Sequence, residues 1–138
     1  MGLYLCVFDE LGGELEGLEV GAYEDFNFFR DAIVATVEQG NIGSVCPVLN
    51  NHADSDGEWT SVEAHRLLAE LDEISQVMIQ YPPVEFNSEW KKKIAHMFGI
   101  NPKTLLDCFF DIDGEPLIDR LRQLARVSIS SGQPILFQ

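Results

Sequence analysis

His52, Asp54 and Asp56 are the residues of this chain whose types and spacing could do metal chemistry. An imidazole and two carboxylates are ligands that zinc accepts, but no second histidine stands three or four residues from His52. The segment 54–58, Asp-Ser-Asp-Gly-Glu, also resembles part of a calcium loop, but an EF-hand needs a longer run of acidic residues. Segment 111–115, Asp-Ile-Asp-Gly-Glu, is also too short for an EF-hand loop. Asp-Gly turns leading into helices are the simpler interpretation of both segments. A small metal-dependent module or enzyme built on His52, Asp54 and Asp56 is kept as an alternative function.

The three cysteines offer no arrangement for nucleophilic catalysis, which needs a base beside the nucleophile. Cys6, Cys46 and Cys108 have apolar neighbours, which raise the pKa of a thiol and keep it unreactive. Their odd number and the lack of a CxxC pair favour buried free thiols in a reducing compartment. The chain also contains no G-x-S-x-G, Walker or G-x-G-x-x-G sequence. We therefore predict a cytoplasmic protein that is not an enzyme and binds no cofactor.

The net charge of −14 is unevenly distributed over the 138 residues. Residues 1–65 contain thirteen Asp or Glu and one basic residue, Arg30, whereas residues 66–138 contain ten acids and eight bases. A field of this sign repels nucleic acid and anionic membranes and attracts basic partners, although solubility alone also explains it. No apolar run approaches the roughly 18 residues that span a bilayer. We predict neither a nucleic-acid partner nor a membrane partner.

The first half of the chain predicts a hairpin followed by a helix. Residues 3–8 are apolar, 11–13 contain a Gly-Gly turn, and 14–20 alternate acidic and apolar residues. Two antiparallel strands are expected, the second with an acidic outer face formed by Glu14, Glu16 and Glu19. Residues 23–39 are expected to form a helix that ends at Gly40, since apolar side chains recur there at helical spacing. These are Phe26, Phe29, Ile33 and Val37.

The middle of the chain mixes strand and helix patterns. The apolar run 45–49 is interrupted by Pro47, which predicts an edge or irregular strand, and residues 50–59 form a polar loop. Thr60 and Glu63 make a capping box, so a helix starts there and runs to about residue 73. Residues 76–81 are expected to form another strand, ended by two prolines.

The last third predicts three helices and a strand. Ser88 caps a helix that closes at Gly99, and its apolar face consists of Trp90, Ile94, Met97 and Phe98. A short helix over 101–108 and a longer one from Pro116 to Ser131 follow. An apolar strand over 134–137 is expected to dock into the sheet.

Together these patterns predict the order ββαβαβαααβ in one domain over residues 1–138, without repeats or a linker. The fold class is α+β: a single mixed or mostly antiparallel sheet of about four to five strands with helices packed against it.

Neighbouring aromatic residues suggest rings on the surface. Phe28 stands between two phenylalanines of the buried stripe, Phe109 and Phe110 are adjacent, and Trp59 follows the acidic loop. Aromatic anchors rimmed by charge are typical of binding hot spots, whereas packing beneath loops is the alternative. A homo-oligomer through Phe109 and Phe110 is a third option for the function.

The whole chain resembles the immunity protein 70 family of bacterial polymorphic toxin systems. The resemblance lies in segments spread over the chain, namely 1–9 (MGLYLCVFD), 19–23 (EVGAY), 26–30 (FNFFR), 54–59 (DSDGEW), 109–117 (FFDIDGEPL) and 132–138 (GQPILFQ). It implies a protein that binds and neutralises a cognate protein toxin without chemistry of its own, and it brings no mapped binding residues.

An acidic face would steer such a protein onto a basic toxin, and carboxylates could imitate nucleic acid if the toxin is a nuclease. The predicted contact residues are Glu14, Glu16, Glu19, Asp54, Asp56, Glu58 and Trp59.

Overall fold

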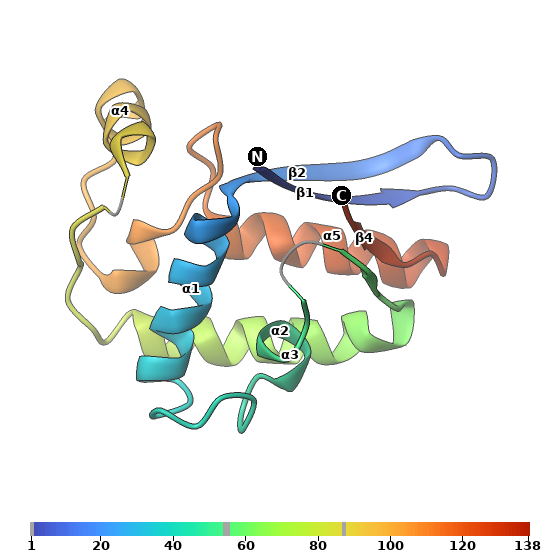
Figure 1. Cartoon of the computed structure of the whole chain (residues 1–138), viewed down its shortest axis with the longest axis horizontal. Coiled ribbons are helices and arrows are strands. Elements are labelled where there is room, and N and C mark those ends of the chain that lie inside the picture. The colour runs from blue at the N-terminus through green and yellow to red at the C-terminus, as the bar shows by residue number, and fades with distance from the viewer. Residues whose placement is uncertain (1, 54–55, 87) are drawn as a thin grey trace.

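The computed structural model describes residues 2–53, 56–86 and 88–138. Over these residues the chain forms five α-helices, one short 3-10 helix and four strands. The strands are β1 (Gly2–Phe8), β2 (Glu14–Ala22), β3 (Glu58–Trp59) and β4 (Ile135–Phe137). They make one antiparallel sheet in the order β2-β1-β4-β3, with the helices packed against it (Figure 1), so the predicted α+β class is confirmed.

The predicted hairpin of β1 and β2 forms, but its register shifts between Val7 and Phe8. Val7 pairs with Glu16 and Phe8 pairs with Glu14, so Leu15 is an extra residue in β2. Directly paired residues of an antiparallel sheet share a face, whereas successive residues alternate. Glu16 therefore lies on the core side with Val7, and the prediction that Glu14 and Glu16 share the outer face is wrong.

Helix α1 (Tyr23–Thr36) follows β2 directly and ends three residues before the predicted end. The carboxylate of Asp25 accepts a hydrogen bond from the main-chain N–H of Ala22 at 3.0 Å, which caps the first turn. The predicted apolar stripe is confirmed, because Phe26, Phe29 and Ile33 are fully buried.

The run 45–49 is not a strand. Pro47 occupies the first position of a short helix, α2 (Pro47–Asn50), where its missing N–H costs no hydrogen bond. Two buried acids hold this segment: Glu38 accepts from the N–H groups of Val45 and Cys46, and Glu70 accepts from those of Val48 and Leu49.

Helix α3 (Ser61–Met78) begins at the predicted capping box, in which Thr60 and Glu63 bond each other's main chain. It continues through residues 76–78, so the strand predicted over 76–81 is wrong. Ile74 and Met78 extend the buried stripe of the helix at a spacing of four, and both are fully buried.

The last helices are α4 (Glu89–Phe98), the 3-10 helix η1 (Leu105–Cys108) and α5 (Leu117–Ser131). Gly99 and Gly132 end α4 and α5 in the left-handed conformation, as the sequence predicts. The predicted apolar face of α4 is only partly buried: Trp90 and Ile94 are half-buried, but Met97 and Phe98 are 70% and 55% exposed. The buried residues of the helix are Lys91 and Ala95.

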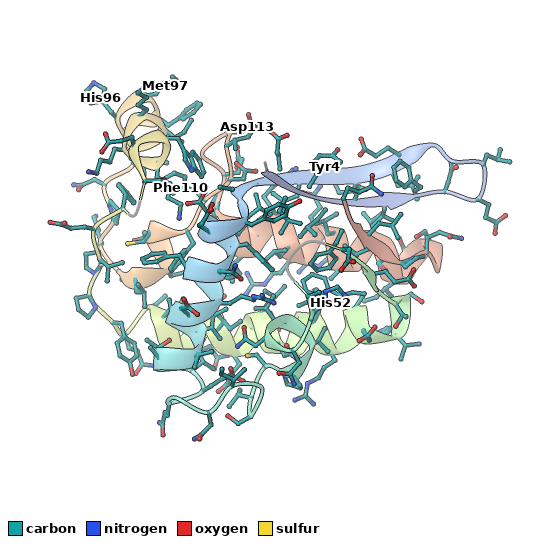
Figure 2. The ribbon with its side chains drawn as sticks, viewed as in Figure 1. Tyr4, His52, His96, Met97, Phe110 and Asp113 are labelled. Carbon is teal, nitrogen blue, oxygen red and sulfur yellow. The ribbon has the colours of Figure 1, made fainter. Side chains whose placement is uncertain are left out.

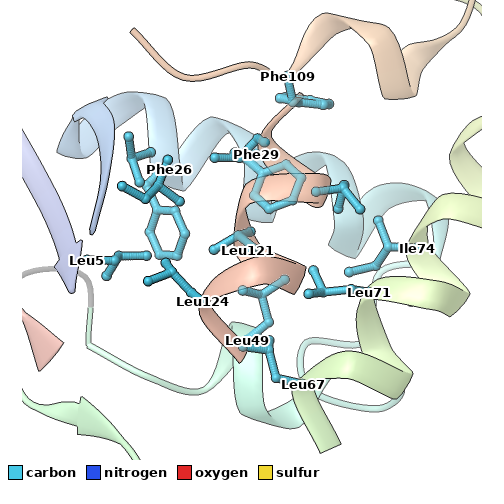
Figure 3. Close-up of a cluster of buried hydrophobic side chains, with 14 of the residues drawn as sticks. Leu5, Phe26, Phe29, Leu49, Leu67, Leu71, Ile74, Phe109, Leu121 and Leu124 are labelled. Atoms are coloured by element: carbon cyan, nitrogen blue, oxygen red, sulfur yellow. The ribbon is translucent and has the colours of Figure 1, made fainter. Parts of the chain in front are cut away.

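The core lies between the sheet and the helices, and its aromatic rings include Phe26, Phe29 and Phe109 (Figure 3). Phe109 and Phe110 are buried, so the predicted exposed interface through these two rings is wrong. Trp59 is also fully buried, and packing beneath loops is the correct alternative for these rings. Among the described helices, none is long and apolar enough to cross a membrane.

Candidate functional site

The face of the sheet away from the helices carries a mixed acidic and aromatic surface. Leu3, Leu5 and Val7 of β1 face the helices and belong to the core cluster. Because side chains alternate along a strand, Tyr4, Cys6 and Phe8 point to the other side, and none of them belongs to that cluster or packs on it. We call this surface the open sheet face and define it by Tyr4, Phe8, Glu14, Glu19, Glu58 and Leu136.

Strand pairing brings acids from two distant segments onto the open sheet face. Glu58 pairs with Leu136, Leu136 pairs with Cys6, and Cys6 pairs with Gly17, which makes one row across all four strands. Three strand spacings separate the ends of this row, a distance of about 14 Å. The hairpin acids and Glu58 therefore lie on one face, at opposite edges of the sheet.

Tyr4 lies in the middle of the hairpin part of this face. It pairs with Glu19 across the strands, and its hydroxyl donates a short hydrogen bond to the carboxylate of Glu14. This bond to a carboxylate, helped by desolvation, raises the pKa of Tyr4 to about 12. Both glutamates are exposed, whereas Tyr4 is half-buried. The ring of Tyr4 is thus bonded to one carboxylate and lies opposite a second, and both carboxylates remain exposed.

Cys6 lies beneath this surface. It is fully buried, and burial, followed by the charge of Glu14, raises the pKa of its thiol. The predicted free, buried state of all three cysteines is confirmed.

Glu16, by contrast, belongs to an internal ion-pair network. Its side chain is 19% exposed and lies 3.7 Å from the Nη2 of Arg120, which also donates to the carbonyl of Gly17 at 2.6 Å. The Nε of Arg120 lies 3.4 Å from the buried carboxylate of Asp111. The carboxylate of Glu16 thus faces Arg120 on the core side of the sheet, away from the open sheet face.

The loop 111–115 packs along the free edge of β2. Asp111 accepts hydrogen bonds from the N–H groups of Asp113 and Glu115, as in the Asp-Gly turn predicted for this segment. The N–H of Ile112 reaches the carbonyl of Glu19 at 3.5 Å. Asp113 and Glu115 are exposed next to the edge of the open sheet face.

The other acidic segment ends at β3. Asp54 lies outside the described residues, and Asp56 is exposed. Trp59 was expected at the surface, but its ring is buried against Phe137 and its indole N–H donates to the carbonyl of Val48 at 2.9 Å. Asp56 and Glu58 are therefore exposed, whereas Trp59 is not.

The side chain of His52 is held by contacts within the chain. Its ring stacks on Phe137 at 4.1 Å between centroids, and its two nitrogens lie 2.7 and 2.9 Å from the carbonyl oxygens of Ala53 and Glu58. A metal ligand needs one nitrogen free to coordinate. Among the described residues, no three His, Cys, Asp or Glu side chains are grouped as metal ligands.

A groove of about 540 Å³ lies between α3, the first turn of α5 and residues 100–110. Its two acids and Arg122 are held by intramolecular contacts: Arg122 lies 3.0 Å from Asp72 and 3.2 Å from Asp119, and Asp107 caps η1. Neither Asp107 nor Asp119 is therefore free to act as a general base toward the groove.

One known family model covers nearly the whole chain. The family model described as Immunity protein 70 matches residues 3–137. No curated protein and no solved structure shows a significant match.

Proposed function

The chain belongs to the immunity protein 70 family, and we propose that it neutralises its cognate toxin by covering a basic surface of the toxin with the open sheet face. Proteins of this family are typically non-enzymatic toxin inhibitors. Such an inhibitor needs a rigid scaffold and a surface complementary to the toxin, both of which can be supplied without catalytic residues.

One observation supports this proposal above the others: Glu14, Glu19 and Glu58 share a sheet face with Tyr4 and Phe8. Half-buried aromatic rings among exposed carboxylates combine apolar contact area with charge, as at many binding hot spots. The net charge of −14 adds a long-range field that would accelerate encounter with a basic protein.

The chemistry of this surface fits a toxin that binds nucleic acid. A nuclease must hold phosphates with basic side chains, and carboxylates spaced over about 14 Å of sheet can occupy the same positions. We therefore propose a nuclease as the class of toxin. The three free buried thiols favour the cytoplasm as the place where the two proteins meet.

The proposal is tested by measuring the association rate and the affinity of the purified toxin domain encoded beside this chain's gene for the wild type and for a Glu14→Lys/Glu19→Lys variant. Both glutamates are exposed, so the variant should fold. We expect association at least tenfold slower, and a wild-type affinity that falls as salt rises.

The matched control is Glu73→Lys, a charge reversal at an exposed acid of α3, which lies beyond α5 from the hairpin (Figure 1). It changes the net charge by half as much and should slow association only slightly. Equal binding by the wild type and the Glu14→Lys/Glu19→Lys variant would show that the open sheet face is not the contact.

A further inference from the structure

Helix α4 exposes apolar side chains to solvent and buries a lysine, the opposite of what core packing favours. Its two large apolar side chains at the C-terminal end, Met97 and Phe98, are 70% and 55% exposed, whereas Lys91 is 2% exposed. Burying apolar area stabilises a fold, and burying a lysine opposes it. The orientation of α4 therefore does not maximise stability, and violations of this kind concentrate at functional sites.

Specific contacts hold α4 in this orientation. The indole N–H of Trp90 donates to the buried carboxylate of Asp25 at 2.8 Å. The same ring packs on Gly21, whose φ of +120° favours glycine, and a Cβ there would lie 2.7 Å from Trp90. The ammonium of Lys91 lies 5.6 and 5.3 Å from the ring centroids of Phe28 and Phe109. The first turn of α4 is thus anchored, and its last turn is presented to solvent.

The exposed end of α4 is continuous with the open sheet face. The ring of Phe98 lies against Gly114, where a Cβ would be 2.9 Å away. The loop that contains Gly114 reaches β2 through the contact of Ile112 with Glu19. Figure 2 shows Met97 on α4, Asp113 on the neighbouring loop and Tyr4 on the hairpin along one side of the molecule.

The charge around this end is mixed: α4 carries exposed lysines, whereas Asp113 and Glu115 are exposed on either side of Gly114, against which Phe98 lies. Lys93 is exposed one helical turn before Met97, and Lys92 is exposed beside it, 3.2 Å from Glu89. A partner surface that receives Met97 and Phe98 would therefore be apolar, with an acidic group opposite Lys93 and basic groups opposite Asp113 and Glu115.

We propose that Met97 and Phe98 form a second anchor for the cognate toxin, filling an apolar depression that has an acidic group opposite Lys93 and adjoins the basic surface covered by the open sheet face. This inference rests on the proposed function and specifies the surface of the partner. The toxin must present acidic and basic groups in positions that match this chain. The second anchor would therefore allow the chain to distinguish its cognate toxin from other basic proteins.

The test measures the affinity of the adjacent-gene toxin domain for three variants of the full chain: Phe98→Ala, Lys93→Glu and the control Val62→Ala. Val62 is an exposed apolar residue of α3, at 77% exposure. We expect Phe98→Ala to raise Kd roughly tenfold or more, as at a hot spot, and Val62→Ala to leave it unchanged. Lys93→Glu should slow association. Circular dichroism and the melting temperature confirm that each variant is folded.

The two proposals fail separately. Wild-type affinity in the Phe98→Ala variant would overturn the α4 anchor, whatever the Glu14→Lys/Glu19→Lys variant does. Weaker binding by Phe98→Ala together with unchanged binding by Glu14→Lys/Glu19→Lys would support the anchor and overturn the open sheet face. No binding by the wild-type chain would overturn both.

Discussion

The indole N–H of Trp90 donates a hydrogen bond to the carboxylate of Asp25 across 2.8 Å, and this bond joins α4 to α1. Asp25 is 4% exposed and also caps α1 through the N–H of Ala22. One buried carboxylate therefore serves two elements, and the attachment of α4 depends on it.

The Trp90→Phe variant should weaken this attachment. The substitution keeps most of the apolar ring but leaves the buried carboxylate with one donor fewer, at a cost of about 1–3 kcal/mol in the free energy of unfolding. Amide hydrogen exchange over residues 89–98 should accelerate. Lys93→Ala, on the exposed side of the same helix, is the control, and unchanged exchange in Trp90→Phe would contradict the anchoring role.

Replacing Lys91 by methionine should stabilise the protein. Burial lowers the pKa of Lys91, and the nearby carboxylate of Asp25 offsets this only in part. The charged form is therefore penalised in the folded state, and Lys91→Met should raise the free energy of unfolding by about 1 kcal/mol at neutral pH. A loss of stability would instead show that the contacts with the two aromatic rings outweigh desolvation.

The same shift has a pH signature. Since the folded pKa of Lys91 lies below the unfolded value of 10.5, unfolding takes up a proton between these two values. Wild-type stability should therefore gain from this residue as the pH rises toward about 10, and Lys91→Met should lose that gain. Urea unfolding at several pH values measures it.

Glu38 should carry part of the acid sensitivity. Burial alone would raise its pKa, but hydrogen bonds from the N–H groups of Cys46, Val45 and Gly43 and from Asn50 outweigh burial and lower it. Its contribution is then present above the unfolded pKa of 4.5 and is lost as the pH falls through the lower folded pKa. Glu38→Gln should cost about 1–3 kcal/mol at neutral pH and flatten this acid dependence.

Glu70→Gln is the matched comparison, because Glu70 accepts from the N–H groups of Val48 and Leu49 in α2, just after those that Glu38 bonds. Its pKa is raised, chiefly by burial, so its charge opposes folding at neutral pH. The substitution should cost less than Glu38→Gln. An equal or larger cost would contradict the difference between the two sites.

Tyr4 should titrate late. Its hydrogen bond to Glu14 raises its pKa to about 12, and Glu14→Gln should bring the pKa back toward the ordinary 10. Ultraviolet absorbance of the phenolate measures this, with Tyr4→Phe to assign the signal. If the high-pH tyrosine titration is the same in the wild type and in Glu14→Gln, the hydrogen bond between Tyr4 and Glu14 does not form in solution.

The three thiols should resist modification in the folded protein. Burial raises the pKa of Cys6 and Cys108, and raises that of Cys46 to about 12 with help from Glu70. A chromogenic disulfide reagent should therefore react with the folded chain far more slowly than with the unfolded chain. Rapid reaction of one thiol without denaturant would show local opening.

Elements with local signals could be predicted from the sequence. The hairpin turn, the capping box at Thr60, and the terminal glycines of α4 and α5 each specify their own structure within a few residues. Residues 45–49 and 76–81 were misassigned because short apolar runs are ambiguous between strand and helix. Pro47 starts a helix here, and Ile74 and Met78 complete the buried stripe of α3.

The candidate site was predictable only in part, because it depends on pairing between distant segments. The extra residue at Leu15 separates Glu14 from Glu16, and the alternating pattern of 14–20 gives no sign of it. Trp59 is buried because β3 pairs with β4, a contact far along the chain. The exposed turn of α4 was missed because the apolar pattern alone predicts burial.

Because β4 lies between β1 and β3, the proposed surface is completed late in folding. Cys6, Leu136 and Glu58 come from three widely separated parts of the sequence, and contacts of such high order form slowly and after local structure. A newly synthesised copy would acquire helices and the hairpin well before it acquires the complete surface. The complete surface therefore requires the whole sheet, and neither the hairpin nor any single helix would reproduce it.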